Sequence, residues 1–423
     1  MVFVNALHVL ISNYSNFILY VSSTTKIIKC LMCKALVVKI VFFLALFFMS
    51  SCAKQNRDIQ ILKIDPEKAS AHELNEVLCI TGITVLECND SAFIGEVSDY
   101  LKYKNRSYVL DKKRKSVHIF DDMGRYVSRI YCYGDGPNEY HQLSCFYIDP
   151  FQNRLVLIDN SKKMRYLYSL TGEFLNTEKE HFAVKNVSFL SDGTKIVVRD
   201  IVDSGVKNGN VINVFKGECN VSSFLPFAYK SGTLVFEKSH PLVTVGNVFY
   251  YNSLMSDTIY GYNGDILFPK YIMDFSGKGV SNYIKDVSID TFGESFYALL
   301  QNHPKDLAYW PQILGEYKGK FFLGYIYGND MCFCVYDLIN GTVNQFLGPY
   351  IGTISLTQIS SGIFSSSNEL FFILDNYKIS LMDKSSMDEI KHSYPSLYES
   401  IKNISLDDNP VILSAKFKNY EKE

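Results

Sequence analysis

The sequence predicts an all-β fold, a six-bladed β-propeller with a short helical insertion, and three observations support this prediction. Tyr and Phe are abundant, with 30 of each but a single Trp in 423 residues, and both are favoured on half-buried pleated surfaces. A pattern of short apolar runs recurs with a spacing of about 48 residues. Turns that contain Asp or Gly separate these runs. Four-stranded units of this length are typical of propeller blades.

The first 52 residues are expected to form a targeting segment that does not belong to the fold. A basic flank at residues 34–39 precedes an apolar run at 40–49, and two serines then lead to Cys52. This is the layout of a secretory signal, and the apolar run is too short to span a bilayer, which takes about 20 residues. Residues 49–52 resemble a bacterial lipobox, in which Cys52 receives the lipid. The alternative is a signal-anchor helix with an incidental cysteine.

The domain boundaries follow from this leader. A compact leader of ordinary length begins at Met32, so residues 1–31 are interpreted as an upstream start that does not belong to the protein. The alternative places the apolar residues 17–21 in an extra segment. After a linker at residues 53–58, residues 59–423 are expected to form a single propeller domain.

The clearest repeat covers two consecutive units. Asp111 and Asp159 are 48 residues apart, and so are Gly124 and Gly172. Each unit contains an apolar strand that ends in Asp, a Lys-rich turn, a second apolar strand, a Gly turn and a third strand. Asp is expected to bond to the turn backbone, and Gly to supply the positive φ of the hairpin.

Weaker copies of this pattern continue along the chain. They occupy residues 191–198, 249–264, 321–341 and 369–375. Residues 276–303 interrupt the strand pattern with apolar spacing that suggests short helices between two blades. Six blades with long loops, or seven compact blades, fit the remaining length, and we expect six.

The cysteines predict neither a complete disulfide framework nor a metal site. Seven cysteines follow the leader, and an odd number cannot all pair within one chain. Cys332 and Cys334 would point to one face of a strand, and no second Cys or His pair with zinc-site spacing accompanies them. Buried small hydrophobic residues are the better interpretation.

Composition and motifs give no support for several classes of function. The formal net charge of -2 offers no general attraction for nucleic acid. The sequence lacks the nucleophile-elbow, phosphate-loop and zinc-protease motifs, so no catalytic residue, cofactor or metal ligand is predicted. The histidines are scattered, and each is expected to have a surface or capping role; they are His118, His141, His181, His240, His303 and His392. Residues 407–408 are expected to form a turn, and 112–115 a solvated basic hairpin tip.

One loop is a candidate for ligand contact. In residues 134–140, Gly134 and Gly136 permit unusual backbone angles, Pro137 stiffens the turn, and Glu139 and Tyr140 can present a carboxylate and a phenol. Inter-blade connections gather on the usual ligand face of a propeller. The structural alternative is a joint in which Glu139 caps backbone amides and Tyr140 packs between blades.

The order of these features resembles the six-bladed β-propeller lipoproteins related to NHL-repeat proteins. The matching elements are the lipobox, the early strand at 59–65, the loop at 134–140, the helical excursion before the fifth blade and the closing segment at 407–413. The resemblance covers nearly the whole mature chain. It implies a ring closed by a terminal strand that joins a blade built from the other end of the chain, which removes exposed strand edges.

Two functions remain open at this point. The first is a binding or scaffolding lipoprotein that presents loops and aromatic side chains to a glycan, peptide or protein. The second is a lyase or hydrolase in the channel, because propellers host many unrelated chemistries. The expected location is the cell envelope, with the lipid in the outer membrane. The linker at 53–58 lacks an acidic run, which favours the periplasmic side over the cell surface.

Overall fold

The computed structural model describes residues 59–200, 209–226, 241–245, 247–253, 256–283, 298–302, 305–366 and 369–418. The predicted leader, Cys52 and the linker at 53–58 lie outside these residues. Residues 1–58 separate from a compact unit, Ile59–Glu423, and everything below concerns that unit. No helix among the described residues is long and apolar enough to cross a membrane.

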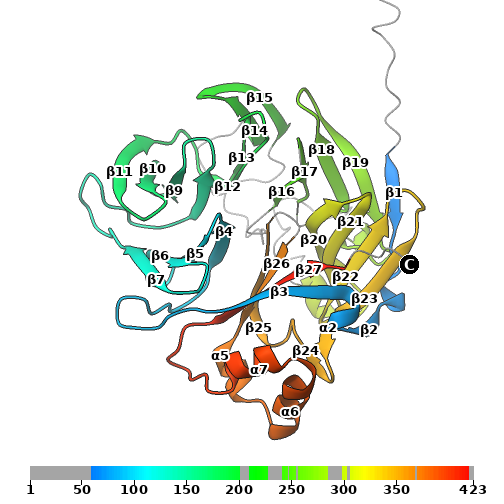
Figure 1. Ribbon diagram of the computed structural model, residues 1–423. Helices are drawn as coiled ribbons and strands as arrows, with labels where there is room; N and C mark the ends of the chain where they lie inside the picture. Colours follow the sequence, from blue (N-terminus) through cyan, green and yellow to red (C-terminus); the bar gives the residue numbers. More distant parts are fainter. Residues whose placement is uncertain are drawn as a thin grey trace, which may run out of the picture. The chain divides into compact units, whose positions relative to one another are not determined.

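Six small sheets form a ring, which confirms the predicted six-bladed β-propeller (Figure 1). Blade 1 contains β4 (Asp99–Tyr103), β5 (Arg106–Asp111), β6 (Ser116–Asp121) and β7 (Tyr126–Ile130). Blade 2 contains β8 (Cys145–Asp149), β9 (Arg154–Asp159), β10 (Met164–Ser169) and β11 (Phe174–Lys179). Blade 3 contains β12 (Val184–Phe189), β13 (Lys195–Arg199), β14 (Asn210–Lys216) and β15 (Cys219–Pro226).

The other three blades take extra strands or share strands between the two ends of the chain. Blade 4 contains β16 (Leu242–Val245), β17 (Val248–Tyr251), β18 (Thr258–Tyr262) and β19 (Leu267–Asp274). Blade 5 contains β20 (Ala308–Tyr317), β21 (Lys320–Tyr327), β22 (Asp330–Asp337), β23 (Val343–Ile351) and the short β24 (Ile354–Ser355). Blade 6 contains β25 (Ser360–Ser366), β26 (Glu369–Leu374), β27 (Val411–Phe417) and, from the N-terminal part, β3 (Leu78–Val85).

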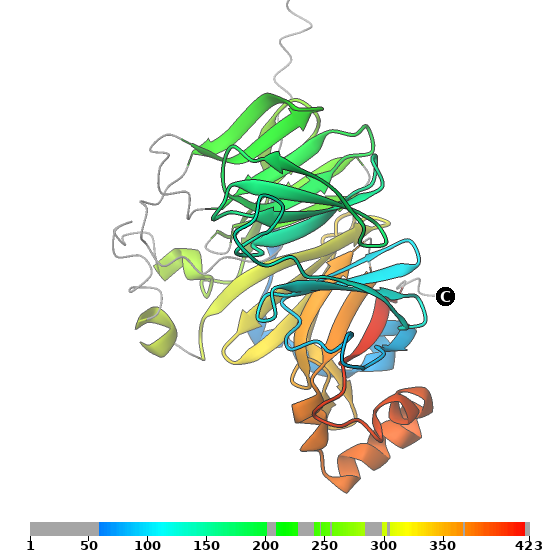
Figure 2. The same cartoon turned by 90° about the vertical axis from the view of Figure 1, so that its left-hand side faces the viewer.

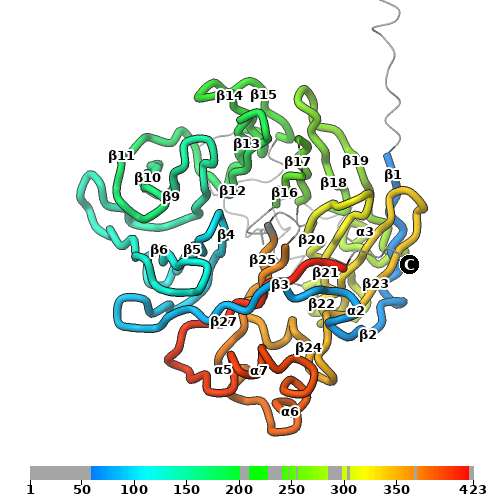
Figure 3. Tube along the Cα trace, in the orientation of Figure 1, coloured from blue at the N-terminus to red at the C-terminus, as the bar shows by residue number. Residues whose placement is uncertain are grey.

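The ring closes through β3. This strand pairs antiparallel with β27, from Val85 opposite Val411 to Leu78 opposite Phe417, and Figure 3 shows the two strands side by side. The first strand of each blade contacts its neighbours in the cyclic order β4, β8, β12, β16, β20, β25 and again β4. Closure therefore matches what the family resemblance implies, and β27 has a pairing partner on both sides.

Two more N-terminal strands extend outer edges. β1 (Gln60–Lys63), which is the early strand of the sequence analysis, pairs in parallel with β19 of blade 4. After the short 3-10 helix η1 (Pro66–Lys68), β2 (Ser70–Glu73) pairs in parallel with β23 of blade 5. The helical turn α2 (Leu74–Val77) then leads into β3. The N-terminal segment up to and including β3 thus pairs with three consecutive blades, which are blades 4, 5 and 6.

The core consists of six apolar clusters, one at each interface between neighbouring blades. The cluster between blades 1 and 2 contains Tyr108, Ile119, Tyr140 and Tyr166, all fully buried. Corresponding clusters fill the other five interfaces. Because both faces of each blade are covered, its middle strands are almost continuously apolar, as in β9. The abundant Tyr and Phe supply the volume of these clusters.

The predicted turn chemistry is confirmed in both copies of the main repeat. Asp111 and Asp159 end β5 and β9 and are fully buried. The Asp111 carboxylate accepts from the backbone N–H of Arg114 at 2.8 Å, and that of Asp159 from Lys162 at 3.0 Å. Gly124 and Gly172 have φ values of 80° and 92°. These are left-handed conformations that glycine adopts without a steric cost.

Besides η1 and α2, helices occur in the predicted insertion and in the connection between β26 and β27. In the predicted insertion at 276–303, the described residues include α3 (Val280–Tyr283) and helical residues 298–302. The sequence pattern did not predict α5 (Asn376–Ser380), α6 (Lys384–Ser393) and α7 (Pro395–Ile401), which connect β26 to β27 and lie beside the ring (Figures 1 and 2). Their buried residues join the cluster between blades 5 and 6.

Candidate functional site

A cavity of about 280 Å3 lies at the centre of the ring. The first strands of all six blades line it, which are β4, β8, β12, β16, β20 and β25 (Figure 1). Each of these is the end strand of its sheet, so its alternate backbone N–H and C=O groups point away from the sheet. The cavity is therefore surrounded by backbone donors and acceptors as well as by side chains.

In the part of the chain that the structure describes, the side chains that line the cavity are aromatic, aliphatic or uncharged polar, apart from one lysine. Ser188 and Thr244 form a hydroxyl–hydroxyl hydrogen bond between blades 3 and 4. Lys102 is the cation, and its ammonium lies 4.0 Å from the Glu369 carboxylate and 5.6 Å from the centre of the Phe371 ring. The aromatic part of the wall is Tyr103, Phe146, Tyr147 and Phe189.

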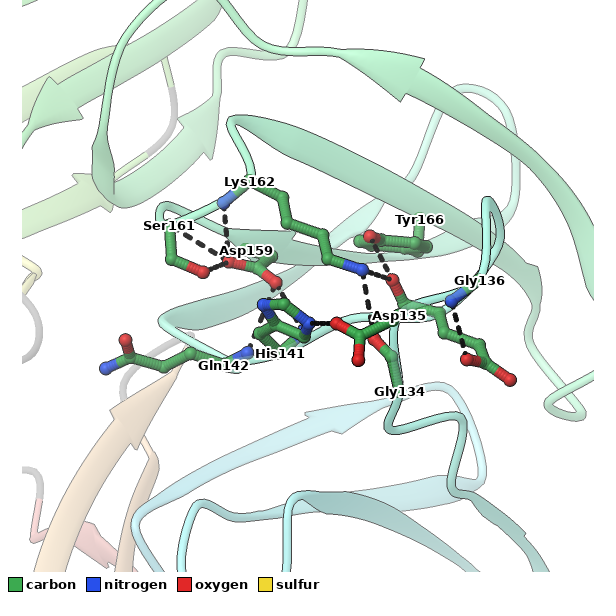
Figure 4. Close-up of polar contacts among 10 residues, drawn as sticks. Gly134, Asp135, Gly136, His141, Gln142, Asp159, Ser161, Lys162 and Tyr166 are labelled. Carbon is green, nitrogen blue, oxygen red and sulfur yellow. Dashed lines mark hydrogen bonds and ion pairs between the residues drawn. The ribbon is translucent and has the colours of Figure 1, made fainter.

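The candidate loop at 134–140 connects blade 1 to blade 2 and is fastened to the β9–β10 turn (Figure 4). The Lys162 ammonium donates to the carbonyl oxygens of Gly134 at 3.0 Å and Glu139 at 2.7 Å. The buried Asp159 carboxylate accepts from the backbone N–H of His141 at 2.7 Å. Burial alone would raise the pKa of Asp159, but the hydrogen bonds that it accepts outweigh burial and lower the pKa.

Within this loop, Glu139 and Tyr140 make structural contacts. Glu139 accepts from the backbone N–H of Gly136 at 2.8 Å. Tyr140 is fully buried, its hydroxyl donates to the Lys115 carbonyl at 2.8 Å, and its ring meets that of Tyr166 edge to face at 5.8 Å. These are the contacts that the structural alternative describes, so the side chain of Tyr140 cannot touch a ligand in this conformation.

The reason for the two glycines differs from the one that the sequence analysis gives. Neither Gly134 nor Gly136 has a positive φ. A Cβ atom on Gly134 would overlap the Glu139 carboxylate, and one on Gly136 would lie 3.0 Å from it. The glycines therefore make room for the folded-back Glu139 side chain. On the exposed side of the loop, the side chains of Asp135 and His141 are hydrogen-bonded.

The histidines do not form a cluster in the described part of the chain. The prediction of a surface or capping role is wrong for His118, which is fully buried and bonds through Nε2 to the Ser116 hydroxyl at 3.0 Å. Its strand, β6, is covered on both faces, so no position in it is a surface position. Burial lowers the pKa of His118 to about 4. His181 and His392 are exposed, and His240 and His303 lie outside the described residues.

The other residues that the sequence singles out make contacts that fit a structural role. Cys332 and Cys334 are fully buried between blades 4 and 5, as predicted, and burial raises the pKa of the Cys332 thiol to about 12. Residues 407–408 lie in a turn, in which Asp408 accepts from the backbone N–H of Ser405 at 2.7 Å. Residues 112–115 form a turn, and its Arg114 guanidinium lies 4.5 Å from the Phe93 ring.

A charged cluster that the sequence analysis missed lies between blades 2 and 3, at a cavity of about 100 Å3. Arg165 pairs through Nε with Glu178 at 2.6 Å and through Nη2 with Glu218 at 3.0 Å. Burial alone would lower the pKa of Arg165, but its hydrogen bond with Glu218 outweighs burial and raises the pKa. Because its charges are paired, this cluster fits a structural joint between blades.

The described residues surround the central cavity with aromatic rings, hydroxyl groups and free strand edges. Among them, no group of three or more His, Cys, Asp or Glu side chains could hold a metal ion. Sequence reasoning missed the lining of the central cavity. The local sequence indicates the first strand of each repeat unit. It does not show that six such strands converge on one cavity, because no spacing along the chain records which distant strands meet.

Comparisons with known proteins agree with this fold. The model of a family described as a domain of unknown function, DUF4934, matches residues 82–416. A solved structure from Bacteroides fragilis carries a name that describes the protein as exported by inference. It is similar to this chain, with a TM-score of 0.68 and 19% identity over 85% of this chain and 100% of that chain. A member of the DUF4221 family from Bacteroides vulgatus has a TM-score of 0.50 and 10% identity over 81% and 98% of the two chains. No curated protein matches.

Proposed function

The chain belongs to the DUF4934 family, and we propose that it is an exported, membrane-anchored binding module that holds a glycan, peptide or protein segment at its central channel. The observation that carries this proposal is the central cavity of about 280 Å3, which all six blades line. A closed ring of small sheets is rigid, so it presents a preformed site.

The lining favours an uncharged ligand with both apolar and hydrogen-bonding parts. Tyr and Phe rings offer flat apolar surfaces, and Ser188, Thr244 and the free edges of six strands offer donors and acceptors. Sugars and peptides carry both kinds of surface. The similarity in fold to other propellers also fits a binding or scaffolding role in general.

The alternative of a channel lyase or hydrolase needs groups that move protons or polarise a substrate. In the described ranges, no Asp, Glu or His lines the cavity, and its lining cation, Lys102, pairs with Glu369, which also accepts from the Thr81 hydroxyl at 2.5 Å. No observation on these residues favours the enzyme, so binding is the function that we propose.

Export and anchoring rest on the N-terminal sequence. The basic flank, the apolar run at 40–49 and Cys52 support a lipidated mature N-terminus, and the similar structure from Bacteroides fragilis is named as exported by inference. The linker at 53–58 lacks an acidic run, which supports the periplasmic leaflet of the outer membrane. In this arrangement about six residues join the lipid to the propeller.

Calorimetry with two probe sets tests binding in the channel. The first set is maltotriose, cellotriose, xylotriose and mannotriose, and the second is triglycine and trialanine with acetylated N-termini and amidated C-termini, which carry no charge. We expect at least one probe to bind the parent protein and Thr244→Phe to weaken that probe at least 10-fold, because the added ring fills the cavity. Thr177→Phe, on the outermost strand of blade 2, is the matched control and should bind as the parent does.

Two results would overturn the proposal. One is that no probe of either set binds, and the other is that Thr244→Phe binds as tightly as the parent. Because Thr244→Phe could destabilise the fold, its melting temperature is measured beside that of Ser365→Phe. Ser365 lines the same cavity from blade 6, so its variant repeats the test from another direction.

A further inference from the structure

The single Trp of the chain has an unusual backbone conformation on a channel-lining strand. Trp310 has a φ of 57°, a region that bulky residues rarely occupy. It also precedes Pro311, and the residue before a proline strongly prefers an extended conformation. Backbone strain of this kind persists where the surrounding fold enforces it, and it is concentrated at ligand sites.

The strain has a clear structural origin in a β-bulge. Tyr309 pairs with Ile326 and Gln312 with Gly324, so Trp310 and Pro311 together stand opposite one residue of β21. A bulge bends its strand and redirects a side chain that would otherwise follow the pleat. Here the result is an indole that is 36% exposed. A purely structural Trp would be expected in one of the inter-blade clusters.

Trp310 lines a groove of about 500 Å3, which is within the range of roughly 300–1,000 Å3 for small-molecule sites. The groove is formed by the beginnings of β20 and β25 and by residues 96–98 before β4. Later residues of the same three strands line the central cavity. The groove is therefore at the end of the channel where the first strands begin, which is also where the inter-blade loops gather.

The other walls of the groove combine apolar and hydrogen-bonding groups. Ile363 and Phe364 are apolar, and Gln312 contributes an amide. Glu96 and Lys112 are both exposed and carry opposite charges, so the side chains of the groove have no net charge. Among the described residues, no hydrogen bond occupies the Gln312 amide or the Lys112 ammonium. The balanced charge of these side chains favours a ligand without net charge.

We propose that this groove binds a neutral saccharide, with a pyranose ring stacked on Trp310 and its hydroxyl groups bonded to Gln312, Glu96 and Lys112. The face of an indole is electron-rich, and the C–H groups of a pyranose face carry partial positive charge, so the two surfaces attract each other. Beside the indole, Gln312, Glu96 and Lys112 provide hydrogen-bond donors as well as acceptors. Sugar hydroxyl groups need both, because each can donate and accept a hydrogen bond. This inference rests on the proposed function: of the glycan, peptide and protein ligands proposed above, it selects the glycan.

Because the chain contains a single Trp, emission excited at wavelengths that tyrosine does not absorb reports on the surroundings of Trp310. The probes are maltotriose, cellotriose, xylotriose and mannotriose, titrated into the parent protein. We expect a saturable change of emission with at least one of them. By calorimetry, Trp310→Ala should weaken that sugar at least 10-fold and Trp310→Phe by less, because Phe retains a stacking surface. Phe174→Ala, at an exposed aromatic residue of β11, should bind as the parent does.

Trp310→Gly separates a ligand-binding role from a structural one. Glycine adopts a positive φ without strain, so the variant should melt within about 2 °C of the parent and still lose at least 10-fold in affinity. A clearly lower melting temperature with unchanged affinity would assign Trp310 a structural role and overturn the inference.

The remaining outcomes distinguish this inference from the proposed function. In one outcome, calorimetry detects sugar binding without a change of emission, Trp310→Ala binds the sugar as the parent does, and Thr244→Phe does not. The saccharide site in the groove is then refuted, and the proposed site in the central cavity stands. If no trisaccharide binds but a tripeptide does, the saccharide is wrong and the binding module stands. If no probe binds at all, both fail.

Discussion

Single buried polar residues hold this propeller together at the joints between strands. Asp159 is the best example, since its carboxylate accepts from the backbone N–H groups of His141, Ser161 and Lys162 at 2.7, 2.8 and 3.0 Å. Asp111 bonds in the same way to Gly95 at 2.6 Å and Arg114 at 2.8 Å. Each Asp therefore fastens both its own turn and the segment that enters the blade.

Asp159→Ala should cost about 3 kcal/mol of unfolding free energy, because it leaves several partly buried N–H groups without an acceptor. Urea denaturation measures this loss. Asp192→Ala is the matched control, since Asp192 is an exposed turn residue that accepts from the Thr194 N–H at 2.9 Å, and it should cost about 1 kcal/mol. Equal losses of unfolding free energy in the two variants would show that the hydrogen bond between Asp159 and the inter-blade segment at His141 contributes little to stability.

His118 should make stability depend on pH. Burial lowers its folded-state pKa to about 4, below the value of about 6.5 for an unfolded histidine. Its stabilising effect is therefore complete above pH 6.5 and is lost as the pH falls towards 4, because protons bind the unfolded chain first. We expect a loss of about 2 kcal/mol between pH 7 and pH 5 from this residue.

Urea denaturation at both pH values measures that loss, and His118→Gln should lack it. His181→Gln, at an exposed histidine, should retain the loss. An identical pH dependence in the parent and in His118→Gln would contradict the assignment.

At the scale of elements, the strand that closes the ring matters more than the strands that extend its edges. β3 supplies the outer strand of blade 6 over eight residues, whereas β1 adds four residues to the outer edge of blade 4. Loss of β3 would expose the edge of β27 to pairing with other molecules.

Two shortened chains test this difference. A chain that begins at residue 66 lacks β1 and should remain a cooperatively folding monomer with a somewhat lower melting temperature, because Leu62 is fully buried. A chain that begins at residue 87 also lacks β2, α2 and β3, and we expect it to self-associate and to lose its cooperative transition. Light scattering and thermal melting are the measurements. A monomeric, cooperatively folding chain from residue 87 would show that closure through β3 is dispensable.

For the whole molecule, the proposed anchor decides where the propeller works. Cys52→Ser should move the protein from the membrane fraction to the soluble fraction and abolish labelling with a radioactive fatty acid, because the thiol is the acceptor of the lipid. Cys33→Ser, which changes a cysteine inside the leader that begins at Met32, is the control and should leave both unchanged. Membrane retention and labelling of Cys52→Ser would refute lipidation at Cys52.

Much of the architecture could be predicted because its signals are local. The 48-residue spacing of Asp111 and Asp159, the positive φ of Gly124 and Gly172 and the helical insertion all depend on residues within one turn or hairpin. The pattern failed at α5, α6 and α7, which interrupt blade 6, and at His118. A polar residue in a strand predicts an exposed face only where the strand has one, and β6 is covered on both sides.

The hairpins and the turn chemistry of the main repeat follow from the sequence alone, because hydrogen bonds between near neighbours impose those residues, whereas the chain length left both six and seven blades open. Only the tertiary structure decided that β3 completes blade 6, that six strands enclose a cavity and that a bulge exposes Trp310 to a groove. These features join residues that are far apart in the chain. No local periodicity records which distant strands meet, so they exist only once the ring has closed.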